Sequence, residues 1–560
     1  MKKKNSNPVG ALKRTGVYMK SSLGVIALAL VLAALSAVMT IIGPDKIGKM
    51  ATIMSDGLFT GIDLAAIAKI GVFLAIIYCL SALFGFIQHY IMAVVTLKMS
   101  YRMRGELSEK INRVPQKYFN TTSQGDILSR ITNDVSTLQQ GLTNSRYSVM
   151  TGRYPWTNPA AKILPGNAAL IIDTEAITLP KVMKQAGYIT GSVGKCHIGL
   201  GDGNVDWNKR VFPGASEIGY DYSFIQAATN DRVPCVYLEN NKVVGLESDD
   251  PLFVDYRKNF PGEPTGKDNP ELLQMHPSVG HAGSIVNGVS RIGFQKGGKA
   301  AQWRDEDMAE LFLQKAKQFV VDNKDRPFFL YYGLHQPHVP RVPNERFAGK
   351  SGMGPRGDVI LEADWCVDEF LNTLDALGLT ENTIVVLTSD NGPVLDDGYK
   401  DRAVELVGEH RPAGPLRGWK TTMYDGGVRI PFMLRWPAVV KPQVSDAFVC
   451  QMDLLASFAK LLGVTYPDKL DSRSTLKAFL GKSKKGREAL VIEGMFNYAY
   501  RKGDWALIPP YRNHPHCLLY NLKEDIGQQH NVAEKYPDKV KELTDEFEAL
   551  KESTGKKTKF

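Results

Sequence analysis

Two long apolar stretches dominate the first quarter of the 560-residue chain. Residues 23–43 carry no charged side chain, and residues 70–95 form a second apolar run between Lys69 and Lys98. At about 1.5 Å per residue, each run can cross a hydrocarbon core of roughly 30 Å. We therefore expect two membrane spans joined by a short external loop at 44–64. A signal peptide, the alternative for the first run, would have a shorter apolar core and a small-residue cleavage site.

Beyond residue 95 the pattern becomes amphipathic and predicts two helices that separate near Pro115. From about residue 145 onward, apolar strand-like runs alternate with helical stretches. FFLYYGL at 328–334 and TIVVLTSD at 383–390 are the clearest strands, and 305–323 is the clearest helix. This alternation predicts an α/β fold with a largely buried sheet and helices on both faces.

Charge divides the chain at the same place. Residues 1–145 contain 16 Lys and Arg against 7 Asp and Glu. The whole chain has 68 Lys and Arg and 59 Asp and Glu, so residues 146–560 contain 52 basic and 52 acidic side chains. Basic residues flank the two apolar runs, which places both ends of the segment in the cytoplasm. The neutral remainder predicts no nucleic-acid partner. Six scattered cysteines without a CxxC pair indicate neither a zinc site nor a disulfide framework.

The segment RGELSEKINRVPQKYFNTTSQGDILSRITNDV resembles the first intracellular loop of an ABC exporter transmembrane domain. The resemblance covers 1–144, two of the six spans of such a domain, and implies a coupling helix at 125–135 that docks on a nucleotide-binding subunit. A phosphate-binding GxxxxGK[ST] loop is missing, since GSVGKCH at 191–197 lacks the hydroxyl residue after Lys195. Transport would therefore require partner chains and ATP.

The rest of the chain resembles the formylglycine-dependent sulfatase family, arylsulfatase-like enzymes of the alkaline-phosphatase-like fold. Five segments match in the family's order: SRYSVMTGRYP, GYITGSVGKCHIG, LHQPHVP, SDNGP with the following PLRGWKTTMYDGGVRIP, and LLYNLKEDIGQQHNVAEKYP. The resemblance implies a catalytic domain at 145–450, lacking the first strand of its sheet, and a small C-terminal α+β subdomain at 451–560. It implies hydrolysis of the sulfuric ester of a sulfated sugar or an aryl sulfate.

The resemblance also assigns the anion and metal ligands. Asp390 and Asn391 would be oxygen ligands of calcium, a hard cation suited to carboxylate and amide oxygens. Lys195 and Lys420 would hold sulfate oxygens as compact positive charges. Without the family context, Asp390-Asn391-Gly392 is equally a turn and each lysine a solvated surface charge.

Three further residues would act on the ester itself. His338 would bind sulfate and protonate the leaving group, His197 would assist the nucleophile as acid or base, and Arg146 would steady the nucleophile's loop. His335 is either a second contact behind the site or a purely local residue, and His410 is a weaker candidate near the substrate. Four aromatic residues could stack on a sugar ring or belong to the core: Trp207, Tyr220, Tyr222 and Phe224.

The nucleophile itself is missing. In the family it is a formylglycine made from Cys or Ser in C/S-x-P-x-R, and Arg146 places Leu142 at the nucleophile and Asn144 at the proline. Leucine cannot be converted to an aldehyde, so the expected formylglycine cannot form. The paired aspartates that end the family's first strand are also missing, because Asp249–Asp250 and Asp396–Asp397 lie in polar loops and are expected to be solvated. We therefore expect weak or absent calcium binding and no turnover.

Three interpretations remain. The chain is a sulfatase-family hydrolase with a membrane anchor, a transporter component, or a chimera of two genes that meet near 143–145. Both resemblances stop at the same point, neither is complete, and no linker rich in Gly, Ser or Pro separates them. These observations favour the chimera. They also predict a membrane location, although sulfatases of this family are often exported.

Overall fold

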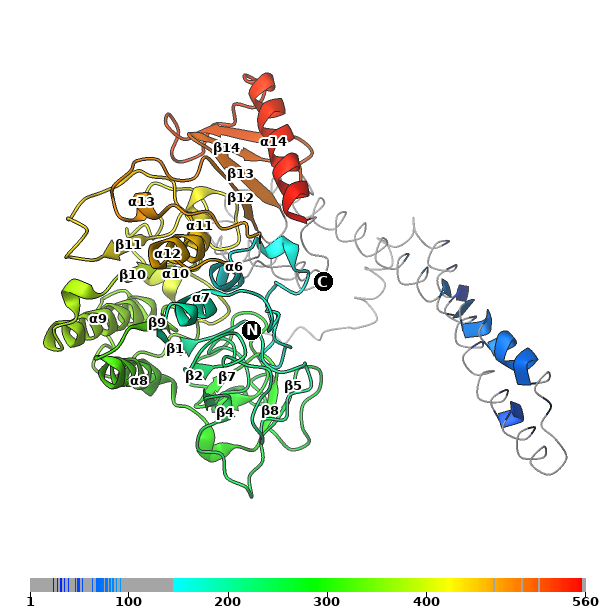
Figure 1. The fold of residues 1–560 in the computed structure, drawn as a ribbon. Helices are drawn as coiled ribbons and strands as arrows, with labels where there is room; N and C mark the ends of the chain where they lie inside the picture. The colour runs from blue at the N-terminus through cyan, green and yellow to red at the C-terminus, as the bar shows by residue number, and fades with distance from the viewer. Residues whose placement is uncertain are drawn as a thin grey trace, which may run out of the picture. The chain divides into compact units, whose positions relative to one another are not determined.

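The computed structural model describes residues 145–555, except 467–468, 495–496 and 512–513, and scattered positions between 24 and 91. The chain divides into two compact units, Met1–Gln139 and Gln140–Phe560. In the second unit the strands lie in the centre and the longer helices lie outside them (Figure 1).

The predicted membrane segment is described only in part. The described positions within 23–43 and 70–95 are helical, whereas 125–135 and Leu142 lie outside the described residues. Among the residues that the structure describes, no helix has both the length and the apolar character needed to cross a bilayer. The two spans and the coupling helix therefore stay predictions.

A five-stranded mixed sheet, in the order β4-β3-β2-β1-β9, forms the centre of the second unit. Its strands are β1 (Ile189–Lys195), β2 (Tyr222–Gln226), β3 (Tyr237–Glu239), β4 (Lys242–Val243) and β9 (Phe328–Gly333). β2, β1 and β9 are parallel, with β1 in the middle, while β3 and β4 add antiparallel strands at one edge. β1 is buried from Thr190 onward, as expected for a strand covered on both faces.

Three predicted elements are confirmed. The strand predicted at 328–334 is β9, and the helix predicted at 305–323 is a 3-10 turn followed by α8 (Met308–Asn323). The strand predicted at 383–390 is β10, which is shorter (Val385–Thr388) because its ladder with β11 ends at Thr388 and the chain bends at Asp390.

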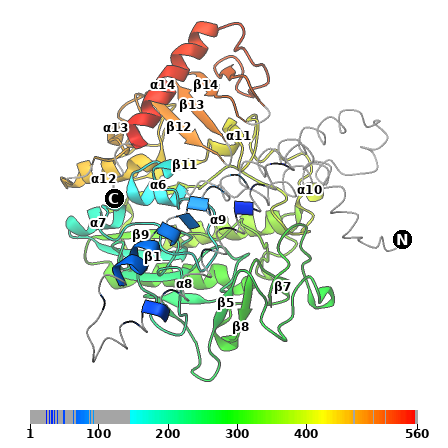
Figure 2. The ribbon, with the colours of Figure 1, turned by 90° about the vertical axis from the view of Figure 1, so that its right-hand side faces the viewer.

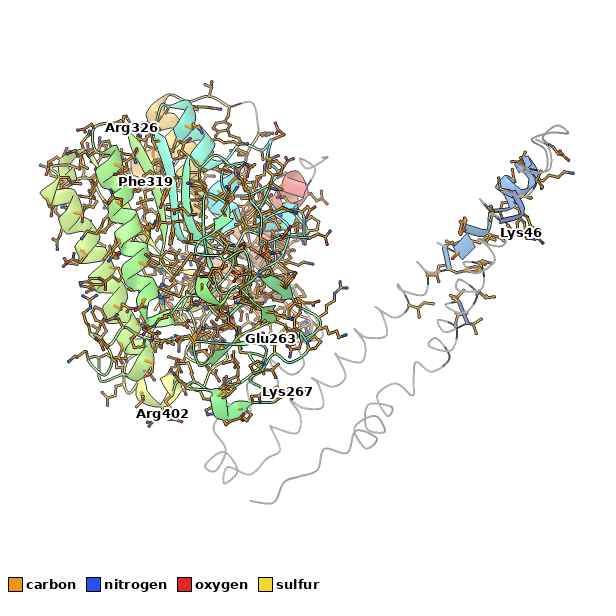
Figure 3. All side chains as sticks on the ribbon, turned by 90° about the horizontal axis from the view of Figure 1, so that it is seen from below. Lys46, Glu263, Lys267, Phe319, Arg326 and Arg402 are labelled. Carbon is orange, nitrogen blue, oxygen red and sulfur yellow. The ribbon has the colours of Figure 1, made fainter. Side chains whose placement is uncertain are left out.

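β10 pairs with the antiparallel strand β11 (Phe432–Arg435), and these two strands form a sheet separate from the first. Between β9 and β10 the chain passes through α9 (Gly354–Ala376), which lies beside α8 (Figure 3). Asp390 follows β10 by two residues and lies 4.0 Å from Lys195 at the end of β1, so β1 and β10 end on the same side of the molecule.

Helices cover both faces of the two sheets (Figure 1). On one face, the ring of Phe370 in α9 lies 5.9 Å from the ring of Tyr332 in β9, and Asp375 of α9 lies 3.5 Å from Arg435 of β11. On the other face lie α6 (Ser145–Thr151), α7 (Leu179–Gln185) and α12 (Leu454–Leu462). This second group shares one apolar core with Tyr331 of β9 and Val386 of β10. The helices therefore hold the two sheets in one layer.

The C-terminal part of the described chain forms a second, smaller layer of strands and one helix, and the predicted domain boundaries 145–450 and 451–560 stay predictions. Its antiparallel sheet contains β12 (Ala489–Glu493), β13 (Tyr498–Lys502), β14 (Trp505–Ile508) and β15 (Leu518–Asn521), with α14 (Pro537–Gly555) across one face (Figure 2). Arg487, just before β12, forms a fully buried ion pair with Asp453 at 2.7 Å. Asp453 directly precedes α12, whose apolar residues belong to the core around α6 and α7, so this pair joins the β12–β15 sheet to that core.

Several short elements complete the described part of the fold. They are the strand pairs β5 (Phe253–Asp255) with β8 (Phe294–Lys296) and β6 (Ile285–Val286) with β7 (Val289–Ser290), and the single-turn helices α10 (Ala403–Leu406), α11 (Asp425–Val428) and α13 (Leu476–Phe479).

Candidate active site

The predicted site residues gather where the parallel strands end. Lys195 is the last residue of β1, and Asp390 follows β10 by two residues. Gly194 has a φ of +96°, and a Cβ there would lie 2.1 Å from the carbonyl oxygen of Gly333, so glycine is needed for β1 and β9 to approach this closely. Polar residues at the carboxyl ends of parallel strands occupy the usual ligand crevice of such sheets.

Asp390 lies between two of the predicted cations. Its Oδ2 is 3.1 Å from Nη2 of Arg146 and 4.0 Å from Nζ of Lys195. The hydroxyl of Ser145 donates a hydrogen bond of 2.7 Å to the backbone carbonyl of Asp390, which ties the first turn of α6 to the end of β10. Burial opposes ionisation of Asp390, but Arg146, Lys195 and Lys420 together hold the pKa of its carboxyl group well below the usual range.

Lys195 is the least compensated cation of the group. It is buried, and Asp390, the only carboxylate within ion-pair distance among the described residues, is engaged more closely by Arg146. Burial and the neighbouring charge of Arg146 lower the pKa of the Lys195 ammonium from 10.5 to about 7. An additional anion near Lys195 would stabilise the charged ammonium and raise its pKa again.

Lys420 pairs with Asp397 at 2.6 Å, which overturns the expectation of a solvated acid at Asp397, whereas Asp396 is exposed as expected. Lys420 and His338 lower the pKa of Asp397, although burial acts in the opposite direction. The next residue after Lys420, Thr421, has a φ of +79°, a strained conformation for a β-branched residue. Such strain, on the order of 1–3 kcal/mol, is found mainly at functional sites.

The predicted histidines have defined protonation states. Nε2 of His197 lies 3.0 Å from the carbonyl oxygen of Leu164, and Nδ1 of His338 lies 2.7 Å from that of Val339. A carbonyl only accepts, so these nitrogens carry the proton and the other ring nitrogen of each keeps a lone pair. Burial and the charge of Lys195 lower the pKa of His338 to about 3. Burial and the charge of Arg232 hold the pKa of His197 well below its ordinary value of 6.5. Both rings are therefore neutral at pH 7 before an anion binds.

The two weaker histidine candidates lie in different surroundings. His335 is buried with its ring 6.1 Å from that of Phe312 in α8, and burial lowers its pKa to about 3. It is thus part of the packing behind the site. His410 is exposed, and within the described residues its ring makes no hydrogen bond or ion pair. Its role near the substrate stays a prediction.

The sequence missed a buried polar cluster that follows β2. Asp231 is 3% exposed, and its carboxylate accepts hydrogen bonds from Nη1 of Arg232 at 2.6 Å, from the hydroxyl of Thr229 and from Nε2 of His281 at 3.0 Å. Burial opposes ionisation, but Arg232, His281 and His338 hold the pKa of Asp231 well below the usual range. The signal was present in YDYSFIQAATNDRVP, where polar residues follow an apolar strand as they do at Asp390.

The four aromatic residues are mainly core residues. Trp207, Tyr220 and Phe224 are buried in the apolar cores, and Tyr222 stacks on Phe319 of α8 with ring centroids 5.9 Å apart. The rings of these four residues therefore pack against the protein and do not present a face to a sugar. Trp419, next to Lys420, is 46% exposed instead.

The described residues do not form a complete calcium site. No group of three or more His, Cys, Asp or Glu side chains suited to a metal ion occurs within the described part of the chain. Asp390 already pairs with Arg146, and the amide of Asn391 donates to the carbonyl of Gly392 at 2.8 Å. Two oxygen-bearing side chains fall far short of the six to eight ligands that calcium takes in proteins.

Comparison with known proteins decides the family. Residues 129–464 match the sulfatase family, and residues 417–553 match the C-terminal region of N-sulphoglucosamine sulphohydrolase. The chain belongs to the sulfatase family. Residues 26–151 also match the ABC transporter transmembrane region, so the two family matches overlap at 129–151.

Individual sulfatases support this assignment. The N-acetylgalactosamine-6-O-sulfatase of Bacteroides thetaiotaomicron is 48% identical over 426 residues, which cover 73% of this chain and 83% of the relative. Human arylsulfatase A is 28% identical over 431 residues, 70% of this chain and 73% of its own. A solved structure from work on the metabolism of multiple glycosaminoglycans by Bacteroides thetaiotaomicron is 47% identical, with a TM-score of 0.72, and the match covers 73% of this chain and 89% of that one. The alkaline-phosphatase-like sulfatase fold is thus confirmed, and the family's activity is hydrolysis of sulfuric esters, in general with calcium and a formylglycine.

Proposed function

We propose that this chain recognises a 6-O-sulfated amino sugar of a glycan but does not hydrolyse the ester. The buried, undercompensated ammonium of Lys195 at the carboxyl edge of the sheet is the observation that carries the proposal. The similarity to an N-acetylgalactosamine-6-O-sulfatase supports the choice of sugar. Aryl sulfates are the alternative substrate class.

The proposed binding mode uses three charged groups in one buried site. The ammonium of Lys195 would donate directly to one sulfate oxygen, because its existing partner Asp390 is 4.0 Å away. Lys420 would contact a second oxygen while it keeps its 2.6 Å pair with Asp397. Arg146 would hold Asp390 in place rather than touch the ester. Point charges in a site with little water attract an anion more strongly than they would at an open surface.

His338 would complete the anion site only after a change of protonation. Its unprotonated nitrogen cannot donate to sulfate or to the leaving oxygen, because Nδ1 carries the proton for Val339. The negative charge of a bound ester raises the pKa of a nearby imidazole, which favours the doubly protonated ring that can donate. This is the state that a general acid for ester cleavage would need.

Trp419 is the proposed contact for the sugar ring. It is exposed and adjacent to Lys420, and aromatic faces provide flat apolar area beside polar groups. Its backbone is fixed, since its N–H donates to the hydroxyl of Thr422 at 3.1 Å and its carbonyl accepts from the same hydroxyl at 2.8 Å. A Trp419→Ala variant should therefore weaken binding of a sulfated sugar and leave binding of inorganic sulfate unchanged.

The proposed lack of turnover rests on the nucleophile. Leu142 offers no oxygen or sulfur, and Ser145, the first hydroxyl residue after it in the described chain, donates its hydrogen bond to the carbonyl of Asp390. Without an attacking group the chain would bind the ester and release it unchanged. The incomplete metal site leads to the same expectation.

Calorimetry and a hydrolysis assay test the two parts separately. The purified full chain should bind N-acetylgalactosamine 6-sulfate more tightly than unsulfated N-acetylgalactosamine, and Lys195→Gln should abolish that preference. No sulfate should be released from this sugar or from an aryl sulfate with calcium present, beyond the release by a Lys420→Ala control. Equal affinity for the two sugars would refute recognition, whereas sulfate release above the control would refute inactivity.

We further propose that residues 1–144 place the protein in a membrane, with the sulfatase part on the cytoplasmic side. The match of 26–151 to the ABC transporter transmembrane region supports this alternative role, which would need a nucleotide-binding partner. Carbonate extraction of cell membranes, followed by protease digestion from each side, tests the location. A chain released by carbonate would contradict it.

The proposed chimeric origin concerns the overlap of the two family matches at 129–151. A single long sequencing read of source DNA across codons 135–150 would settle it. A read that preserves the junction establishes a continuous gene, and a read that breaks there shows two genes.

A further inference from the structure

Arg356, in the first turn of α9, is buried without a counter-charge of its own. It is 5% exposed, and among the described residues neither its Nε nor its Nη1 has a hydrogen-bond acceptor. A guanidinium keeps its proton at any ordinary pH, so the charge stays in the interior and is costly there. The other three buried arginines of the described chain each pair with a carboxylate: Arg291 with Asp305, Arg341 with Asp401, and Arg487 with Asp453.

Arg341 occupies the acceptors that lie near Arg356. Its guanidinium donates to the backbone carbonyls of Pro337 and of residues 394–395, and to Oδ2 of Asp401. The second oxygen of Asp401 already accepts a backbone N–H. Burial and the charge of Arg341 lower the pKa of Arg356, although Asp401 acts in the opposite direction. Two guanidinium groups therefore share one carboxylate, and this cluster has an excess of positive charge.

The positive end of α9 adds to this excess. Arg356 is the third residue of the 23-residue helix, and Met353, directly before the helix, provides no side-chain cap. The first N–H groups of a helix lack acceptors within the helix and carry a partial positive charge. Asp358 does not compensate them, because its carboxylate accepts hydrogen bonds from the backbone N–H groups of Gly349 and Ser351. An anion at this end of α9 would meet both the guanidinium charge and the charge of the helix end.

The burial of Arg356 limits the size of such an anion. Nε and Nη1 are enclosed by the protein, so Nη2 is the nitrogen left to meet an ion from outside. The start of α9 is also packed closely against α10, because a Cβ at Gly354 would lie 2.5 Å from Cδ1 of Leu406. These contacts favour a compact ion with several oxygens, which can accept from Nη2 and from the helix N–H groups together.

We propose that Arg356 and the first turn of α9 form a second anion site, which binds a small tetrahedral oxyanion of the sulfate type. Within the described residues, no hydrogen bond or ion pair joins Arg356 to Lys195, Lys420 or His338, so the second site is separate from the candidate active site. The ion is either free in solution or the sulfate group of a sugar, and both sources present the same oxygens to the guanidinium.

Equilibrium dialysis of the purified full chain with radiolabelled sulfate tests this proposal, with chloride keeping the ionic strength constant. The variants are Arg356→Met, Lys195→Gln and the combination of both. Methionine replaces the buried arginine stem without its charge. Arg326→Met is the matched control, because it removes the same charge at an exposed arginine. Arg326 and Arg402, which directly precedes α10, lie at opposite ends of the helices (Figure 3).

The unaltered chain should bind two sulfate ions, one at Lys195 and one at Arg356. Arg356→Met should weaken the binding of one ion at least tenfold, since a charge-assisted contact is lost, and Lys195→Gln should remove the other. The double variant should bind neither ion, and Arg326→Met should bind both. In Lys195→Gln, displacement of the remaining sulfate by N-acetylgalactosamine 6-sulfate would identify a sulfated sugar as the source, and no displacement would identify the free ion.

Hydrogen exchange of the unaltered chain locates the second ion without any substitution. Sulfate should slow exchange at 354–357 and leave β12–β15 unchanged. Arg356→Met should be at least as stable as the unaltered chain in chloride, because it removes a buried charge that has no partner. If this variant fails to fold, the exchange measurement decides the question.

Two results would overturn the proposal. Equal sulfate binding by Arg356→Met and the unaltered chain, or an equal loss in Arg326→Met, would show that net charge alone attracts the ion. Exchange at 354–357 that does not respond to sulfate would place the ion elsewhere. Failure of the proposed function gives a different pattern, in which the unaltered chain binds one ion that Arg356→Met removes and Lys195→Gln retains.

Discussion

Replacing Lys195 with methionine should stabilise the fold while it removes the proposed sulfate site. Methionine is nearly as long as lysine and fills the same buried space without a charge. The change leaves Asp390 paired with Arg146 at 3.1 Å, so the replacement leaves no buried carboxylate without a partner. A residue that serves ligand binding commonly lowers stability in this way.

The magnitude follows from the pKa of Lys195. Folding lowers it from 10.5 to about 7, so between these values the unfolded chain binds a proton that the folded chain does not. Stability is therefore reduced by the full amount below pH 7 and recovers as pH rises toward 10.5. At 1.36 kcal/mol per pKa unit, this shift gives an upper limit of about 4 kcal/mol for the loss at pH 7.

Urea unfolding followed by tryptophan fluorescence at pH 6.5, 7.5 and 8.5 measures the effect. The difference in unfolding free energy between Lys195→Met and the unaltered chain should favour the variant at pH 6.5 and shrink by up to about 1.4 kcal/mol per pH unit above pH 7. Lys162→Met, at an exposed lysine, is the matched control and should show no pH-dependent difference. A difference independent of pH, or a variant that is less stable at pH 6.5, would refute the reasoning.

Three further predictions concern other parts of the molecule. Affinity for a sulfated sugar, measured by calorimetry, should fall between pH 6 and 8.5 because the Lys195 ammonium loses its proton near pH 7, and a Lys195→Gln variant should show a flat profile. Arg487→Met should lower the unfolding free energy by about 3–5 kcal/mol, since it leaves the buried carboxylate of Asp453 unpaired, and thermal denaturation should show the loss. The double variant Leu142→Cys with Asn144→Pro rebuilds C-x-P-x-R, so co-expression with the modifying enzyme should yield an aldehyde detectable by hydrazide labelling; ester hydrolysis should still be absent because the described residues supply no complete set of metal ligands.

Local sequence patterns predicted the strands and the helix that are buried along a whole face. The strands at 328–334 and 383–390 and the helix at 305–323 were readable because their apolar spacing reflects burial on defined faces. The family resemblance then brought together Arg146 and Asp390, which are separated by more than 240 positions. Nothing in the local pattern indicates that proximity.

The parts that sequence reasoning missed depend on tertiary contacts. Asp397 lies in a polar loop and looks like a solvated acid, and only the folded chain shows that Lys420 pairs with it. Asp231 is flanked by Thr229 and Arg232, a common surface composition, although burial between β2 and His281 makes it part of the site. The family resemblance implied a sheet without its first strand, but neither strand's own sequence shows that β9 and β10 belong to separate sheets of the described chain.

The interruption between β9 and β10 also bears on how the molecule comes apart. In a continuous sheet, main-chain hydrogen bonds make distant strands lose structure together. Here the described strands on the two sides are joined by helices and side-chain packing, without a shared ladder. The β10–β11 pair should therefore open at lower free energy than the β1–β2–β9 ladder, as a separate cooperative unit. Proteolytic nicking in the native state should then begin on the β10–β11 side.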